Sequence, residues 1–223
     1  MPSTPDDGPG VSLGELEEGI ALLRFERPRQ LNALTDDTVA ETLRLLDRVG
    51  ADQKTRVLVL TGAGRGFCAG FDLGLAGDAP RSAELGETPA WMQRQELFAS
   101  LVTRLRALRQ PVIAAVNGPA NGAGLGIALA AEIRIAARSA AFNSAFVRVG
   151  MSSCDIGVSW LLPRCVGMSR AFDIMLTGRM VDAAEAERIG LVSETVDDAR
   201  LLPRALEIAR TIVSVNVGRP RTI

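Results

Sequence analysis

Two glycine-rich turns, each directly after a short apolar strand, constrain the fold of this chain most strongly. Residues 56–60 run into a turn at residues 61–70, and residues 112–116 run into a turn at residues 117–124. Strands that are β-branched and apolar on both faces are typical of a sheet covered on both sides. Because each turn opens towards a helix, the unpaired backbone N–H groups of both turns should lie at the carboxyl ends of neighbouring strands.

The rest of the chain alternates strands and helices. Residues 19–25 and 133–137 predict two further strands, and Thr35 with Asp36 and Asp37 predicts the capped, acidic start of a helix. We expect a loop at residues 76–89, a helix at 91–109 that stops before Pro111, and later helices around residue 160 and at residues 171–176, 183–189 and 201–213. The connections between strands have the lengths of right-handed crossovers, so we expect an α/β fold. Residues 1–10, rich in Pro, Gly, Ser and Asp, are expected to form a disordered tail, and residues 11–223 a single domain.

The composition narrows the possible partners and compartment. Lys+Arg 25 and Asp+Glu 26 give a net charge of -1, so no overall basic field attracts nucleic acid or an anionic membrane surface. No apolar run reaches the roughly 20 residues of a membrane helix, and the tail lacks the apolar segment of a signal peptide. The cysteines Cys68, Cys154 and Cys165 are odd in number and share no CxxC spacing. They argue against a disulfide framework and a zinc site, so we expect a cytoplasmic, metal-free protein.

The chain contains no histidine and no tyrosine. A Ser-His-Asp triad, an imidazole base, a HExxH metal site and a tyrosine acid are therefore all excluded. Any chemistry must come from carboxylates, backbone N–H groups, thiols, hydroxyls, Lys or Arg.

The N–H groups of the two turns could hold a carbonyl oxygen or an anion, although tight turns also need glycine for purely conformational reasons. A Rossmann nucleotide site is disfavoured because neither Gly62-Ala63-Gly64-Arg65-Gly66 nor Gly122-Ala123-Gly124-Leu125-Gly126 keeps the GxGxxG spacing. A P-loop is disfavoured because the chain has no Gly-Lys-Ser/Thr tripeptide.

Several segments resemble the crotonase (enoyl-CoA hydratase/isomerase) superfamily. They are Arg27-Pro28 with Leu31-Asn32-Ala33-Leu34, residues 57–62, Gly66-Phe67-Cys68-Ala69-Gly70-Phe71-Asp72-Leu73, residues 112–120 with Gly122-Ala123-Gly124, residues 129–132, Leu176-Thr177-Gly178-Arg179, Glu185-Ala186 and Gly190-Leu191-Val192. The match keeps its order from about Leu13 to Val213. It implies the crotonase spiral of ββα units, a coenzyme A (CoA) thioester as ligand with no further cofactor, and a homotrimer or hexamer.

The resemblance also assigns roles to individual residues. The backbone N–H groups of Phe71 and Ala123 correspond to an oxyanion hole that holds the thioester carbonyl, with Gly70 and Gly122 beside them. The backbone of Ala69 and Leu73 is expected to meet the adenine. Arg29 is a possible phosphate contact, although an arginine on a surface turn is more often simply solvated.

The sequence departs from the family where its hydratases hold two glutamates that position a water molecule. These positions fall on Gly126 and Phe146. The one acid left nearby is Asp155, which we expect to be either an acid/base group or the N-cap of the helix that follows. Gly126, Phe146 and Asp155 together resemble a 4-chlorobenzoyl-CoA dehalogenase, but that enzyme also relies on a histidine.

Other reactive side chains fit structural roles. Glu132 and Asp72 are expected to fix the backbone around them. Cys68 and Cys154 are expected to be buried, inert thiols because no neighbouring cation is evident. Residues 213–223 do not resemble the C-terminal helices of the family, so these helices are expected to be shortened or altered and self-association weakened. The sequence thus predicts a CoA-thioester enzyme without efficient hydratase activity, or else a non-catalytic acyl-CoA binding or regulatory protein.

Overall fold

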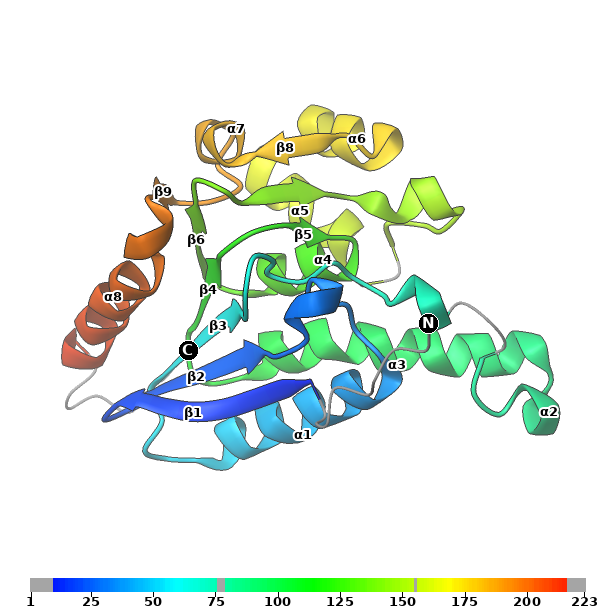
Figure 1. Cartoon of the computed structure of the whole chain (residues 1–223), viewed down its shortest axis with the longest axis horizontal. Helices are drawn as coiled ribbons and strands as arrows, with labels where there is room; N and C mark the ends of the chain where they lie inside the picture. Colours follow the sequence, from blue (N-terminus) through cyan, green and yellow to red (C-terminus); the bar gives the residue numbers. More distant parts are fainter. Residues whose placement is uncertain (1–9, 76–78, 155, 216–223) are drawn as a thin grey trace.

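A computed structural model describes residues 10–75, 79–154 and 156–215 of the chain (Figure 1). Its larger sheet has six strands in the order β1-β2-β3-β4-β6-β9. The strands are β1 (Val11–Glu17), β2 (Ile20–Phe25), β3 (Val57–Gly62), β4 (Val112–Val116), β6 (Ile133–Ala137) and β9 (Glu194–Val196). Strands β1 and β2 form an antiparallel hairpin, and every other pairing in this sheet is parallel.

Both faces of the central strands are buried, as their apolar sequences predict. Leu58, Leu60 and Val116 point to one face, where α1 (Asp36–Ala51) and α3 (Glu87–Ala107) cover them. Val57 and Val59 alternate to the other face, beneath α8 (Leu201–Val215). Because β3 and β4 are parallel neighbours, their carboxyl ends, and therefore both glycine-rich turns, lie at the same edge of this buried sheet.

A smaller sheet lies beyond that edge. It contains β5 (Ala120–Asn121), β7 (Ala141–Asn143) and β8 (Met180–Asp182) in the order β5-β7-β8. The short buried helix α4 (Ala123–Ala130) follows β5 and packs against α3 and α5 (Val158–Val166). Helices α6 (Met168–Thr177) and α7 (Ala183–Arg188) complete this part of the molecule, seen at the top of Figure 1.

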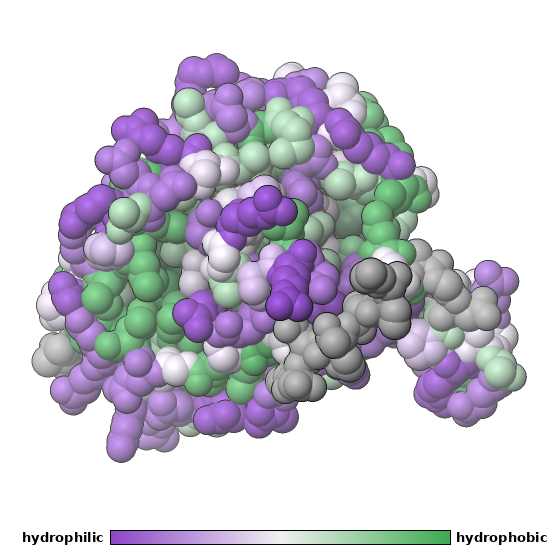
Figure 2. Space-filling model, in the orientation of Figure 1, coloured by the Kyte–Doolittle hydropathy of each residue, from purple (hydrophilic) through white to green (hydrophobic). Residues whose placement is uncertain are grey.

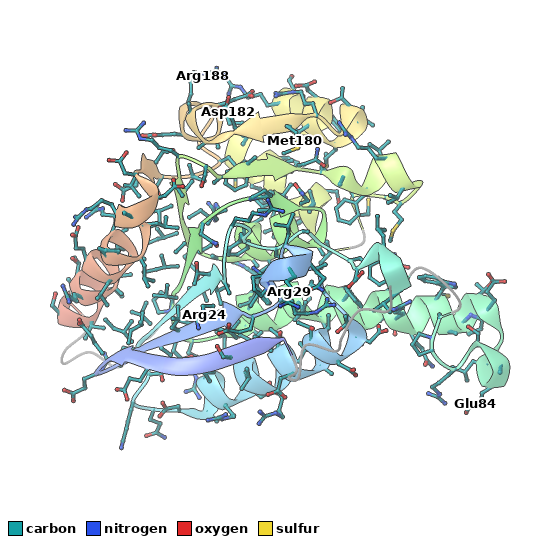
Figure 3. The ribbon with its side chains drawn as sticks, in the orientation of Figure 1. Arg24, Arg29, Glu84, Met180, Asp182 and Arg188 are labelled. Carbon is teal, nitrogen blue, oxygen red and sulfur yellow. The ribbon has the colours of Figure 1, made fainter. Side chains whose placement is uncertain are left out.

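The predicted helices are present, although α3 begins at Glu87 and α6 at Met168, four and three residues before their predicted starts. Thr35 is the N-cap of α1, and its hydroxyl accepts a hydrogen bond from the Thr38 amide at 3.1 Å. The loop predicted at residues 76–89 is partly wrong, because α2 (Ser82–Leu85) and the first turn of α3 lie there; Pro89 is tolerated in that turn, where a helix needs no N–H donor. Helix α2 and the start of α3 project from the body, with Glu84 at the tip (Figures 1 and 3).

Short 3₁₀ helices complete the described structure. They are η1 (Pro28–Gln30), η2 (Leu73–Leu75), η3 (Ala145–Val149) and η4 (Asp198–Arg200). Within the described residues, no helix is both long and apolar enough to cross a membrane. The tail at residues 1–9 and residues 216–223 lie outside the described residues, so the predictions made for them stay predictions.

Candidate active site

The two glycine-rich turns lie against each other through their main chains. The Asn121 amide donates to the Cys68 carbonyl at 3.0 Å, and the amides of Phe67 and Cys68 each approach the Pro119 carbonyl at 3.1 Å. A parallel bridge between Cys68 and Ala120 joins the same segments. Because backbone bonds fix both turns, their remaining N–H groups are held in a defined geometry.

The Phe71 amide faces away from the strand-like segment that supports it. Leu34 donates to the Gly70 carbonyl at 2.7 Å and accepts from the Asp72 amide at 3.0 Å. In such a parallel bridge the residue between the two bonded neighbours directs its own N–H to the opposite side. Phe71 lies between Gly70 and Asp72 and therefore presents its N–H away from Leu34.

The Ala123 amide is the first of helix α4, and such amides have no acceptor within their own helix. Its N-cap residue is Gly122, and the first helical bond in this turn runs from the Gly126 amide to the Gly122 carbonyl at 3.1 Å. The N-terminal end of a helix also carries partial positive charge, which favours a developing oxyanion.

Gly70 is the residue that lets the two donors approach each other. Its φ of +93° lies in the region that side chains rarely adopt. A Cβ atom there would lie 2.7 Å from the Asn121 carbonyl oxygen and 3.3 Å from the Ala123 nitrogen. The Phe71 and Ala123 amides thus flank a contact that only glycine permits.

Phe71 and Ala123 both line a pocket of about 530 Å³. This volume suits a small organic ligand. The lining is mostly apolar and aromatic, and it comprises Phe71, Leu73, Trp91, Arg94, Gln95, Phe98, Ala123, Phe146, Val149, Gly150, Met151, Ser152 and Ile156. Phe71 and Ala123 therefore border a largely apolar cavity, an environment in which a hydrogen bond to a carbonyl is strengthened.

Neither position of the two missing glutamates offers a carboxylate; Phe146 lines the pocket, and Gly126 does not. A Cβ atom on Gly126 would lie 2.8 Å from the Ile156 carbonyl oxygen and 3.0 Å from an Ile156 side-chain carbon. Phe146 is buried and lines the pocket, and two of its ring carbons would lie 3.8 Å from a Cβ atom added at Gly122. The main chain at residue 156 thus occupies the space that a longer side chain at position 126 would need.

Asp155 lies outside the described residues. Its neighbour in the chain, Ile156, lines the pocket. The N-cap residue of α5 is Gly157, which has no side chain to act as a cap.

The remaining predicted binding residues lie around the first turn. The Ala69 amide donates to the Leu31 carbonyl at 2.9 Å. Leu73 is 60% exposed at the pocket mouth. Arg29 lies on η1 (Figure 3), is exposed and does not line the pocket. Of the predicted binding residues, Leu73 and Phe146 contribute to the pocket surface itself, while Gly70, Gly122 and Gly126 shape the backbone behind it.

Two asparagines that sequence reasoning left without a role hold the first turn in place. The Asn32 side chain is buried; it donates to the carbonyls of Ala63 at 2.9 Å and Gly66 at 2.7 Å. The Asn117 side chain accepts from the Gly62 amide at 3.0 Å and donates to Gly66 at 3.1 Å. Each asparagine is a polar residue within or beside an otherwise apolar motif that predicts a turn. This contrast was the sequence signal that could have identified both as residues that hold the turn.

Cys68 is buried, as predicted, and burial raises the pKa of its thiol to about 12. This thiol is therefore protonated at neutral pH and is not a nucleophile. The prediction that Cys154 is buried is wrong, because Cys154 is exposed in the turn before α5.

Asp72 and Glu132 have the structural roles that the sequence predicts. Asp72 accepts from the Gly74 amide at 3.1 Å and pairs with Arg27 at 3.0 Å. Glu132 accepts from the Val112 amide at 2.9 Å and pairs with Arg106 at 2.8 Å. Both carboxylates fix the segments that carry them.

Comparison with known proteins identifies the family. The model of the enoyl-CoA hydratase/isomerase family matches residues 15–218. A probable enoyl-CoA hydratase of Mycobacterium leprae is 46% identical over 190 residues, covering 85% of this chain and 65% of that protein. The 1,2-epoxyphenylacetyl-CoA isomerase of Escherichia coli is 41% identical over 207 residues, covering 91% and 76%. A crystal structure of a probable enoyl-CoA hydratase/isomerase from Mycobacterium abscessus aligns with a TM-score of 0.84 at 40% identity, covering 92% and 75%.

The chain therefore belongs to the enoyl-CoA hydratase/isomerase family of the crotonase superfamily. The predicted α/β crotonase fold is confirmed. The chain spans about two thirds of the length of the curated relative from Mycobacterium leprae, at 65%. The predicted shortening of the C-terminal helices remains a prediction.

Proposed function

We propose that this protein binds a CoA thioester with its carbonyl oxygen between the Phe71 and Ala123 amides, and that it stabilises the enolate of that thioester. The observation that carries the proposal is that Phe71 and Ala123, from two separate glycine-rich turns held together by backbone hydrogen bonds, line one largely apolar pocket. Each preorganised donor of this kind typically contributes roughly 3 to 4 kcal/mol of transition-state stabilisation.

The chemistry that follows from this site is proton transfer next to the carbonyl. A base removes a proton from the carbon beside the thioester, and the electron pair moves to the carbonyl oxygen, which the two amides stabilise. Return of the proton at a different carbon completes an isomerisation. Asp155 is the proposed base, because the described part of the pocket lining contains no carboxylate side chain.

The nucleotide part of CoA is proposed to lie against the first turn. The backbone of Ala69 and Leu73 would meet the adenine, and Arg29 would approach a phosphate from the exposed surface of η1. No cofactor beyond CoA itself is required for this chemistry.

A non-catalytic acyl-CoA binding or regulatory protein is the second candidate function. The closed position 126 and the buried Phe146 favour it, because they leave the oxyanion hole intact and remove the hydratase machinery.

We expect the protein to bind an acyl-CoA thioester more tightly than the thioether analogue of the same chain length, because the thioether lacks the carbonyl that the two amides hold. Calorimetric titration with both ligands and with NAD measures this difference. Tight binding of NAD with no response to acyl-CoA would overturn the proposal. Turnover of a panel of enoyl- and dienoyl-CoA thioesters, run beside the titrations, separates the enzyme from the second candidate, for which binding occurs without turnover.

The proposed assembly is a homotrimer or hexamer. Met168, Phe172 and Leu176 form an exposed stripe at four-residue spacing on α6, and Trp160 and Val149 extend the apolar surface onto α5 and η3. Figure 2 shows apolar surface along the edge formed by α6 and η3. Exposed apolar surface of this kind marks a protein interface.

We therefore expect Phe172→Glu to shift the protein towards smaller species in light scattering across a dilution series, because a charge in a buried apolar interface is costly. Val215→Glu is the matched control, since Val215 is also apolar and is more exposed, 73% against 47% for Phe172, but lies on α8, away from the stripe. Native protein that is monomeric at the highest concentration, or a Phe172→Glu variant with an unchanged mass, would contradict the assignment of this face.

A further inference from the structure

Arg94 is a buried arginine that joins three elements beside the pocket. It lies on α3 and is 6% exposed. Its Nε donates to one carboxylate oxygen of Asp36 at 2.8 Å, and its Nη2 donates to the other at 2.7 Å. This bidentate geometry is among the strongest and most directional that a protein side chain forms. It fixes the guanidinium plane relative to the first turn of α1.

The same guanidinium holds the segment that carries the proposed Phe71 donor. Its Nη1 donates to the Leu75 carbonyl at 3.1 Å. Its central carbon lies 4.6 Å from the centroid of the Phe71 ring and 5.4 Å from that of Trp91. The Phe71 ring is held in turn by Phe98, edge to face at 5.4 Å. Residues 71–75 are thus held at both ends by one side chain.

The backbone and the ring of Phe71 are fixed from opposite directions. Leu34 holds the main chain on either side of Phe71 through two hydrogen bonds, as described above. Arg94 and Phe98 hold its ring. Cation–π contacts gain strength when the cation is desolvated, as it is here. A catalytic donor must be held within about 0.5 Å of its productive position, and a misplacement of about 1 Å can lower a rate about 10²-fold.

We propose that Arg94 is a positioning residue that sets the direction of the Phe71 N–H towards the ligand carbonyl through its contacts with the Phe71 ring, the Leu75 carbonyl and Asp36. The inference rests on the proposed function, because the carbonyl in question is that of the thioester. The sequence does not single out Arg94, because the helix predicted at residues 91–109 is recognised by its apolar spacing and no local pattern marks this arginine as buried.

The test compares native protein with Arg94→Met, which keeps the length of the side chain and removes its charge and donors. The matched control is Arg104→Met, because Arg104 lies on the same helix and also pairs with an α1 carboxylate, that of Asp47, but at the exposed surface. The readout is the infrared stretch of a ¹³C-labelled thioester carbonyl in bound acyl-CoA, which reports the strength of the hydrogen bonds to that oxygen. Affinity for the thioether analogue is measured alongside.

We expect the bound carbonyl to absorb at lower frequency than in water for native protein and for Arg104→Met. In Arg94→Met most of this shift should be lost, and affinity for the thioether, which has no carbonyl to orient, should fall by less than affinity for the thioester. If native protein turns over a thioester of the panel, the kcat of Arg94→Met should be about 10²-fold lower than that of native protein, with KM little changed. A full native shift in Arg94→Met would overturn the inference and leave the proposed function standing. A native protein that binds acyl-CoA without any shift would overturn both.

A second variant keeps the test decisive if Arg94→Met does not fold. Asp36→Asn keeps the shape of the side chain that pairs with Arg94 but removes its negative charge, which weakens the pair. It should reduce the carbonyl shift partially, and an unchanged shift in this variant would count against a positioning role.

Discussion

Replacing Gly70 by alanine is expected to separate the two donors and to abolish binding of the thioester carbonyl. The added Cβ would lie 2.7 Å from the Asn121 carbonyl oxygen, so the turns must move apart. The φ of +93° adds strain, of about 1–3 kcal/mol, for any residue with a side chain. Loss of one aligned donor typically lowers a rate about 10²- to 10³-fold. The melting temperature measures the conformational strain, and the preference for thioester over thioether measures the placement of the two donors.

Gly167→Ala is the matched control for the Gly70 variant. Gly167 has a φ of +81°, but a Cβ atom added there would meet nothing within 4 Å, and the residue does not line the pocket. It should therefore show the conformational strain alone, with a lower melting temperature and normal preference for the thioester. Equal thioester preference in the Gly70 variant and native protein would show that the contact between the turns does not place the donors.

Hydration of a crotonyl-type substrate is expected to be very slow in the native protein, and Gly126→Glu is expected not to restore it. A Cβ atom at position 126 would lie 2.8 Å from the Ile156 carbonyl oxygen. A glutamate there would therefore displace the segment at residue 156 instead of entering the pocket. General acid–base groups typically contribute about 10²- to 10⁴-fold in rate. Rates for native protein and variant, measured beside an efficient hydratase of the family, test this. A native rate typical of such a hydratase would show that the acid/base residues lie elsewhere.

Asp155→Asn is the companion variant in the same assays. If Asp155 moves the proton, isomerisation should fall by about 10²-fold or more while the melting temperature stays unchanged. If Asp155 has only a local structural role, asparagine can accept the same amide hydrogen bonds, and neither quantity should change appreciably.

The parts of the fold that could be predicted from the sequence are those set by local patterns. Strands β4 and β6 fall on the predicted residues 112–116 and 133–137, because short β-branched runs between turns leave little alternative. Thr35 and the acids after it identify the start of α1. Strand β1 was missed because Gly14 and several acids interrupt its apolar pattern, and pairing with β2 overrides that weak local preference.

The candidate site could be predicted only in part, because several of its contacts join residues far apart in the sequence. The motif resemblance suggests Phe71 and Ala123, and the structure brings both to one pocket. The Arg94–Asp36 pair joins residues 58 positions apart, and the contact of Ile156 with Gly126 is also non-local. Such contacts depend on how helices pack, and no local spacing encodes them. Strands β7, β8 and β9 were missed because each has only three residues and depends on pairing with distant strands.

A crystal structure of the protein with an unreactive acyl-CoA thioester tests the central claim most directly. We expect the thioester carbonyl oxygen to lie about 2.7–3.1 Å from the amide nitrogens of both Phe71 and Ala123, with the acyl group in the aromatic pocket. A bound thioester whose carbonyl points away from both amides would contradict the proposed oxyanion hole.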